Sequence, residues 1–251
     1  MSAAFNAIVD VLAAVLVVFH DLTRSYGIAV IVLTLAIRLI LHPLTRKQLK
    51  SMKAMQALGP QISALREKYA SDPKTLNVEV MNLYRANNVN PFGGCLPVLL
   101  QLPLLYALFA VFRRQGLFNG ATFLGLPLDL IISRSSFFSA QFWAELVEGI
   151  ARHPLMLVIF ALVGVTTYLQ QRMSITDPQQ AKMFVFMPVM FTLFSPSFPV
   201  ALSLYWIVST IASIAEYRIV VGRLRLTPAV TAGAGAKPAV LPQRPKRAKK
   251  K

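Results

Sequence analysis

YGIAVIVLTLAIRLILHPL, residues Tyr26 to Leu44, is the stretch that decides the fold: it is almost uniformly apolar and contains one charged residue, Arg38. As an α-helix it would be about 28 Å long, roughly the thickness of the hydrocarbon core of a bilayer. An arginine at that depth costs on the order of 2.5–3.5 kcal/mol. Its side chain is therefore expected either in a water-filled cavity inside the protein, with Thr34 on the same face, or extended towards the nearer membrane surface.

The whole chain has the composition of a membrane protein. Of its 251 residues, 55% are hydrophobic and only 14% are charged, and the mean hydropathy is +0.57. These values predict a polytopic membrane protein and exclude an ordinary soluble domain. Cys95 is the only cysteine, so an internal disulfide is impossible and a small packed side chain is expected there.

Residues 1–25, which precede the first span, carry apolar side chains at helical spacing. No lysine or arginine comes before this apolar run, unlike in a secretory signal or a transit peptide. We interpret 1–25 as an interfacial helix that leads into the span at 26–44. A further short span is the alternative.

Residues 45–90 are polar, with eight basic residues against three acidic ones. Apolar residues from Met52 to Leu65 step by three or four and predict an amphipathic helix. Asp72 is expected to cap a second helix in which Pro73 takes the first position. The segment is therefore predicted to be a helical hairpin outside the bilayer, mobile between about Met52 and Asn87.

The fold class predicted from these patterns is an all-α polytopic membrane protein with five transmembrane helices. The predicted spans are 26–44, 91–112, 154–170, 183–196 and 198–217, the last with an apolar core that ends at Ala215. Between them lie a loop at 113–153, whose aromatic residues suggest contact with the membrane surface, and a polar link at 171–182. Residues 218–251 are rich in proline and alanine, then basic, and are expected to be a disordered tail.

Lysine and arginine are distributed unevenly among the connecting segments. Twenty fall in 45–90, 171–182 and the tail from Glu216, whereas five fall in the segments on the other side of the predicted spans. The positive-inside rule places the hairpin and the C-terminus in the cytoplasm and the N-terminus outside. An odd number of spans satisfies this arrangement.

Several kinds of chemistry have no sequence signature here. The chain contains no HExxH, GxSxG or P-loop pattern, and its three histidines lie in different segments without metal-ligand spacing. No acidic residue is expected inside the spans, although carboxylates are usual there in cation-coupled transporters. We therefore expect no enzymatic activity, no cofactor and no metal.

Three further motifs accompany Arg38 and Pro43-Leu44. They are Asn90-Pro91-Phe92-Gly93-Gly94-Cys95, then Gln101-Leu102-Pro103, and lastly Phe198-Pro199 with Leu204-Tyr205-Trp206. In this order, with a basic hairpin after the first span, the chain from about Tyr26 to Tyr217 resembles the YidC/Oxa/Alb family of membrane protein insertases. It is most similar to the short bacterial form, which lacks the large periplasmic domain of the long form.

The resemblance implies five helices around a hydrophilic groove that opens to the cytoplasm and the lipid. Arg38 would supply its positive charge, and further residues would line or flank it. These residues are Thr34, Gln101, Gln170, Tyr205 and Trp206. For Gln101 an interhelical hydrogen bond is the favoured alternative to direct substrate contact.

The family also implies a function: an insertase and assembly chaperone of the bacterial cell membrane. Its expected partners are nascent membrane proteins, the ribosome, membrane lipids and, as a candidate, the Sec translocon, with the protein acting as a monomer. A small-solute or anion transporter or channel is the alternative function. An intramembrane enzyme is disfavoured because no nucleophile–base pair is evident.

The end of the tail is strongly basic. Its cationic residues are Arg244, Lys246, Arg247, Lys249, Lys250 and Lys251. The resemblance favours contact with ribosomal RNA, and binding to anionic lipid head groups is the alternative.

Overall fold

The computed structural model describes residues 3–90, 96–174 and 186–226, and these are mostly helical. The helices are α1 (Ala3–Thr23), α2 (Tyr26–Ala57), α3 (Gly59–Lys68), α4 (Pro73–Ala86), α5 (Leu96–Phe112), α6 (Ala140–Arg152), α7 (Leu155–Ser174), α9 (Phe186–Phe194), the short 3-10 helix Ser195–Ser197, and α10 (Val200–Leu226). Two short strands, β1 (Thr122–Phe123) and β2 (Leu126–Pro127), pair antiparallel.

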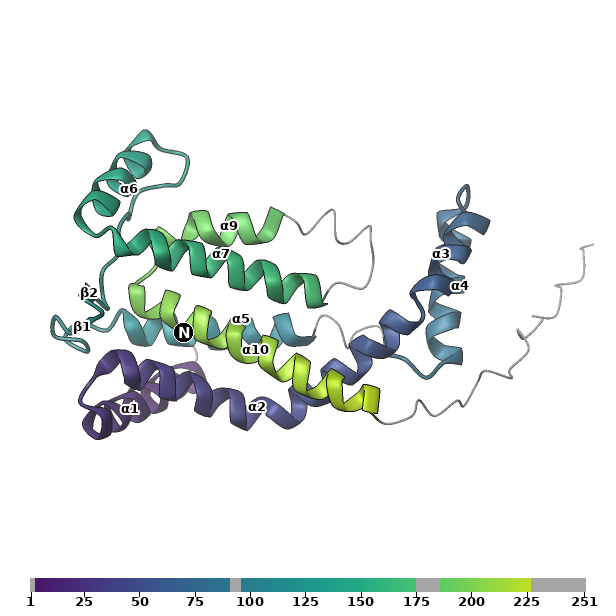
Figure 1. Ribbon diagram of the computed structural model, residues 1–251, viewed down its shortest axis with the longest axis horizontal. Helices are drawn as coiled ribbons and strands as arrows, with labels where there is room; N and C mark the ends of the chain where they lie inside the picture. Colours follow the sequence, from purple (N-terminus) through teal and green to yellow (C-terminus); the bar gives the residue numbers. More distant parts are fainter. Residues whose placement is uncertain (1–2, 91–95, 175–185, 227–251) are drawn as a thin grey trace, which may run out of the picture.

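Helices α2, α5, α7, α9 and α10 lie roughly along one direction and form a bundle (Figure 1). Among the described residues, α10 makes the most extensive contacts, against α2 on one side and α7 on the other. Helix α1 packs on α2 and α5. The α3–α4 pair stands at one end of the bundle, the hairpin end, and α6 with β1 and β2 stands at the opposite end, the loop end (Figure 1).

The bundle has a continuous apolar core towards the loop end. Leu16, Leu108, Leu128 and Ala201, from four different segments, are completely buried. Apolar side chains on the outside of the bundle, such as Leu39, are instead well exposed. This inside-and-outside apolar character is typical of helices that face lipid, because lipid tails are as apolar as the core.

Four described helices are long and apolar enough to cross a membrane. They are Ala3–Thr23, Tyr26–Ala57, Leu155–Met173 and Val200–Gly222. Where the second and fourth spans are predicted, the described residues contain shorter apolar helices, Gln101–Phe112 and Phe186–Ser197. Parts of those two predictions, 91–95 and 183–185, lie outside the described residues. Helix α1 is long enough to be a span, and it is also the helix predicted to be interfacial.

Helix α2 does not end where its apolar part ends. It continues through Pro43 and Leu44 to Ala57, so the polar residues after Leu44 extend the same helix. Arginine, lysine, glutamine and methionine are good helix formers, so nothing in that stretch stops the helix. The predicted single helix from Met52 to Leu65 is wrong: the chain breaks at Leu58, where Pro60 cannot continue the preceding helix.

The second helix of the hairpin begins as predicted. Asp72 caps α4 by accepting hydrogen bonds from the backbone N–H and the hydroxyl of Thr75, and Pro73 is the first helical residue. Helix α3 packs on α4 and on the end of α2. The hairpin is therefore organised by local contacts.

The loop end is tied tightly to the bundle. The turn Leu124-Gly125 between the strands has positive φ at both residues, which suits the two-residue turn of a hairpin. The ring of Phe123, next to this turn, packs on α2 at Gly27. A Cβ atom added to Gly27 would lie 2.1 Å from that ring. Only glycine fits at that position without a shift of the ring.

The same loop satisfies the first backbone donors of α10. Val200 N–H donates to Leu130 O at 3.1 Å, and Ala201 N–H donates to Leu128 O at 2.9 Å. The first N–H groups of a helix have no partner within the helix itself, so these carbonyls fix the start of α10. The loop segment thus closes this end of the bundle over α10.

Candidate functional site: a polar seam along α10

Polar residues on α2 and α10 face each other across the most extensive helix contact. We call this line of residues the polar seam; its members are Thr34, Arg38 and His42 on α2 and Tyr205, Ser209 and Glu216 on α10. The α2 members are spaced by four residues, and the α10 members by four and seven, so each set lies on one face of its helix. The sequence thus builds two matching polar stripes on the mostly apolar parts of the two helices.

Arg38 points across the seam. Its Nε and Nη2 atoms both donate to the Ser209 hydroxyl, at 3.1 and 2.6 Å, and the residue is partly buried. This places the guanidinium against the neighbouring helix, as the interior alternative requires, and not along α2 towards the membrane surface. Tyr205 and Glu216 are also within electrostatic range of Arg38.

A second polar contact lies one turn further towards the hairpin end. His42 Nδ1 is 2.5 Å from Glu216 Oε1, and the Glu216 side chain is only 10% exposed. The expectation that the spans contain no acidic residue is therefore wrong, because Glu216 lies within the apolar helix Val200–Gly222. Because α10 continues to Leu226, Glu216 does not begin a tail but faces α2 within a helix.

Gln101 and Tyr205 connect α5 to the seam. Gln101 Nε2 donates to the Tyr205 hydroxyl at 2.7 Å, and Tyr205 is 2% exposed. The interhelical hydrogen bond favoured for Gln101 is thus present. A buried tyrosine hydroxyl needs a partner, and Gln101 provides it.

Trp206 connects α10 to the other side of the bundle. Its Nε1 donates to the Thr167 hydroxyl on α7 at 2.9 Å, and its ring stacks on Phe191 of α9 at 4.5 Å. Gln170 follows Thr167 by three residues on α7 and is partly buried. Polar contacts therefore reach α10 from three helices: from Arg38 on α2, from Gln101 on α5 and from Thr167 on α7.

Thr34 differs from the other predicted residues. It is 1% exposed, and its hydroxyl donates to Val30 O of its own helix at 2.6 Å. Its side chain faces the packed core, so it does not line an open surface here. Sharing a helical face with Arg38 therefore did not place it at the same depth from the surface.

Sequence reasoning missed Ser209, Thr167, His42 and Glu216. A serine or threonine in an apolar helix commonly bonds its own backbone, so neither type stands out. The available signal was spacing: Ser209 follows Tyr205 by four residues, and His42 follows Arg38 by four. The facing helix could not be named from spacing alone.

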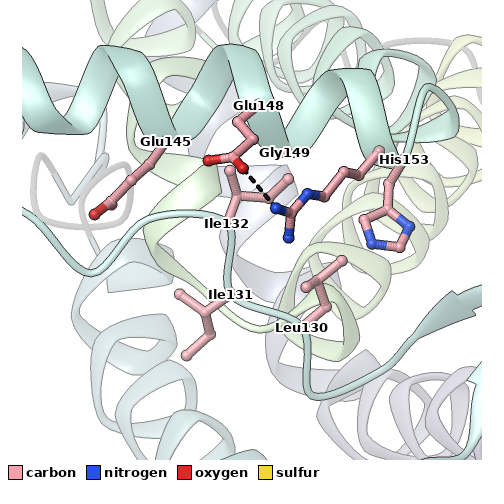
Figure 2. A pocket seen from close by; sticks show the side chains of 8 residues that line it. Leu130, Ile131, Ile132, Glu145, Glu148, Gly149 and His153 are labelled. Atoms are coloured by element: carbon pink, nitrogen blue, oxygen red, sulfur yellow. Dashed lines mark hydrogen bonds and ion pairs between the residues drawn. The ribbon is translucent and has the colours of Figure 1, made fainter.

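A pocket away from the seam lies under α6 at the loop end (Figure 2). Each charged group that lines it has a partner within the protein. Arg152 pairs with Glu148 at 2.5 Å, as the dashed line in Figure 2 shows. Glu145 accepts hydrogen bonds from the hydroxyls of Ser133 and Ser135 at 2.6 and 2.8 Å, which lower the pKa of its carboxyl group. These interactions brace α6 and leave no charged group there without a protein partner.

No group of three or more histidine, cysteine or acidic residues suited to a metal occurs within the described ranges. The basic residues predicted to contact the ribosome or lipid, from Arg244 to Lys251, lie outside the described residues. The seam is therefore the candidate site that the structure can describe. It combines the partly buried Arg38 guanidinium and the His42–Glu216 pair with hydroxyl and amide groups inside an apolar helical bundle.

These features define a class: a helical membrane protein with a polar site, including one arginine, between its apolar helices. The family model described as 60Kd inner membrane protein matches residues 18–225. The chain therefore belongs to that family, the YidC/Oxa/Alb family, and the resemblance inferred from the motifs is confirmed.

Individual relatives support the same family assignment. The chain is 39% identical over 214 residues to a protein of Maridesulfovibrio salexigens named membrane protein insertase YidC, covering 82% of this chain and 37% of the relative. A protein of the same name from Magnetococcus marinus is 36% identical and covers 89% of this chain and 37% of its own. The chain spans a little over a third of the length of these relatives.

A solved structure also matches. It is described as an active YidC insertase crystal structure with the first transmembrane domain resolved, and it superposes with a TM-score of 0.62 at 28% identity. The match covers 85% of this chain and 46% of the other. The bundle described above is therefore similar to an experimentally determined fold.

Proposed function

We propose that this protein is a membrane protein insertase and assembly chaperone. The observation that carries the proposal is the guanidinium of Arg38, which lies between α2 and α10 and is held by a neutral hydroxyl. A hydroxyl partner does not neutralise the guanidinium, and the nearby Glu216 carboxylate is itself paired with His42. The names of the relatives support the same function.

The mechanism follows from the cost of moving polar groups into lipid. An unpaired peptide or hydroxyl group loses several kcal/mol of hydration in an apolar medium, on the order of 2–7 kcal/mol. In our proposal the seam is the resting form of a hydrophilic groove. An arriving polar segment replaces Ser209 as the partner of Arg38 and exchanges hydrogen bonds with the Gln101–Tyr205 pair.

The apolar part of the substrate then leaves sideways into lipid. Burial of apolar surface drives this step, because each buried CH₂ group contributes about 0.8 kcal/mol. The membrane potential adds about 2.3 kcal/mol per charge per 100 mV for acidic segments that move outward. On this account the protein needs no nucleotide and no cofactor, and it is not an enzyme.

The proposed topology follows the positive-inside rule. The hairpin end and the C-terminus lie in the cytoplasm, and the N-terminus and the loop end lie outside a bacterial plasma membrane. Five helices, α2, α5, α7, α9 and α10, are the proposed spans, and α1 is interfacial. Arg114, two residues after the end of α5, pairs with Asp10 in the middle of α1, which supports an α1 that crosses the loop end obliquely.

Reconstitution tests this function. Purified protein in liposomes should insert a single-span test substrate without other proteins. The competing function is a transporter or channel that uses Arg38 as an anion site. Anion flux without insertion would establish that alternative, and insertion without flux would exclude it.

The proposed partners include nascent membrane proteins, lipids, the ribosome and the Sec translocon, with the chain acting as a monomer. The basic tail is the proposed ribosome contact. Detergent-solubilised full-length protein should co-sediment with ribosomes, and a chain ending at Leu226 should not. Equal co-sedimentation of both forms would assign the tail to anionic lipid instead, and salt dependence alone would not separate the two.

A further inference from the structure

Helix α6 is held firmly at the loop end by one of its faces. Phe142 is fully buried, and Gly149 lies so close to Ile132 that a Cβ atom there would come within 2.6 Å of that side chain. The Glu145 carboxylate accepts hydrogen bonds from Ser133 and Ser135 of the preceding segment. The helix therefore cannot turn about its axis without breaking these contacts.

An aromatic cluster fixes the segment before α6. Phe137 is its centre, with ring centroids 5.3 Å from Phe138, 5.4 Å from Trp143 and 4.9 Å from Phe194 at the end of α9. Aromatic pairs at these separations add specific geometry to apolar packing. The cluster thus attaches the segment around α6 to the end of α9.

The outward side of this well-held unit is apolar. Phe138 is 91% exposed, Val147 is 70% exposed and Trp143 is 44% exposed. We call these three residues the α6 patch. Trp143 and Val147 are four residues apart on one face of α6, and Phe138 precedes the helix. Large apolar side chains that are exposed together in this way mark a surface that contacts lipid or another molecule.

We propose that the α6 patch inserts into the boundary between head groups and acyl chains of the outer leaflet. Two observations favour lipid over a protein partner. The lipid-facing surface of α7 begins directly after α6, because Leu157 and Val158 are 53% and 51% exposed. Figure 1 draws α6 displaced sideways from the bundle axis at the end where α7 starts, not stacked beyond it.

The charges around the patch agree with a neutral lipid interface. Glu148 and Arg152 on α6 pair with each other, so the helix offers no surplus positive charge for anionic lipid. Tryptophan and phenylalanine are well suited to this depth, because the bulk of each ring is apolar while the indole N–H reaches polar groups. Binding should therefore depend on acyl packing and little on anionic lipid content or salt.

The anchor has a structural consequence. Through Phe137 and Phe194 it ties the outer end of α9 to a fixed depth in the leaflet, and through α6 it does the same for α7. Trp206 of the polar seam contacts both α7 and α9. The patch therefore sets the position of that wall of the bundle relative to the bilayer.

Spin labels can measure this depth. The single native cysteine is replaced (Cys95→Ser), and labels are placed by Phe138→Cys and Val147→Cys, with Glu148→Cys as a matched control on the next position of α6. In proteoliposomes of zwitterionic lipid, collision with oxygen should exceed collision with a water-soluble nickel chelate at 138 and 147. The order should reverse at 148, where the side chain is well exposed and charged.

A second measurement uses native side chains in case the labels disturb the fold. The chain has two tryptophans, Trp143 and Trp206, so the difference between the native chain and Trp143→Phe reports Trp143. Its emission should be quenched by lipids brominated near the head group and not by aqueous iodide. Nickel-dominated collisions at 138 and 147 together with iodide quenching of Trp143 would overturn the proposal and assign the patch to a protein partner.

Discussion

The polar seam and the α3–α4 hairpin are both polar, yet they are held together in opposite ways. The seam joins residues far apart in the chain, as in the Arg38–Ser209 hydrogen bonds, inside an apolar bundle. The hairpin is organised by local contacts such as the Asp72 cap of α4 and stands away from the bundle (Figure 1). The comparison teaches that polar contacts join distant segments of the chain where water is scarce and near neighbours in the sequence where water is plentiful.

The largest expected effect is on the seam. Arg38→Ala removes the partly buried cation and should slow insertion of substrates with acidic translocated segments. Hydrogen bonds to charged groups contribute about 1.5–3 kcal/mol, so the loss should be roughly ten- to a hundredfold. Insertion rates in proteoliposomes at matched protein amounts would measure it.

Arg38→Lys is the matched control for charge. It keeps the positive charge while changing the donor geometry, and it should retain most of the activity. Normal insertion of every substrate by Arg38→Ala would mean that the guanidinium only braces α2 against α10.

A smaller effect is expected from the close packing at the loop end of α2. Gly27→Ala would force the Phe123 ring to move, and such overpacking typically costs about 1–3 kcal/mol. The thermal unfolding midpoint in detergent should fall. Gly222→Ala, in α10 where the added Cβ meets open space, should instead raise stability slightly because alanine is the better helix former, by about 0.8–1 kcal/mol.

If both glycine variants shift the midpoint equally, the tight fit of Phe123 on α2 is not a stabilising contact. The packing of the loop end on α2 would then contribute little to the stability of the bundle.

The smallest global effect is expected in the hairpin. The hydroxyl and the backbone N–H of Thr75 lower the pKa of the Asp72 carboxyl group. The unfolded chain therefore binds the proton at a higher pH than the folded helix does. The contribution of the cap is complete above the ordinary aspartate pKa of about 3.9 and is lost as pH falls through the lowered value.

Asp72→Ala should accordingly speed amide hydrogen exchange in the first turn of α4 while the bundle amides stay protected. Exchange between Met52 and Asn87 should also be faster than in α2 before Leu44. Equal protection of hairpin and bundle would contradict a mobile hairpin.

Sequence patterns predicted the helical class and the cap at Asp72. The residues that the family resemblance assigns to a groove lie on four helices, α2, α5, α7 and α10, and their role stays a prediction. Arg38 could be singled out because one charge in an apolar run has few explanations. Ser209 could not, because a serine in a span has many. The continuation of α2 to Ala57 was not predicted, because the apolar run ends at Leu44 while the helix goes on. Composition indicates where the apolar run ends and not where the helix ends.

The contact made by Glu216 could not be predicted from the sequence either. Glu216 directly follows Ala215, the end of the continuous apolar run of α10, so its position suggests the start of a solvated tail. Its pairing with His42 depends on how α2 crosses α10, which no local pattern encodes. The depth of Thr34 in the core depends on the same crossing.

The central claim is that the Arg38 side of the seam receives polar substrate segments. Disulfide crosslinking tests it most directly: Ser209→Cys in a Cys95→Ser chain, against a stalled nascent chain with one cysteine in its acidic segment. Ile211→Cys is the control, because Ile211 is 50% exposed on the outer side of α10. We predict crosslinks at 209 that disappear with Arg38→Ala and few at 211. Equal crosslinking at both positions, or crosslinks at 209 that do not depend on Arg38, would contradict the account.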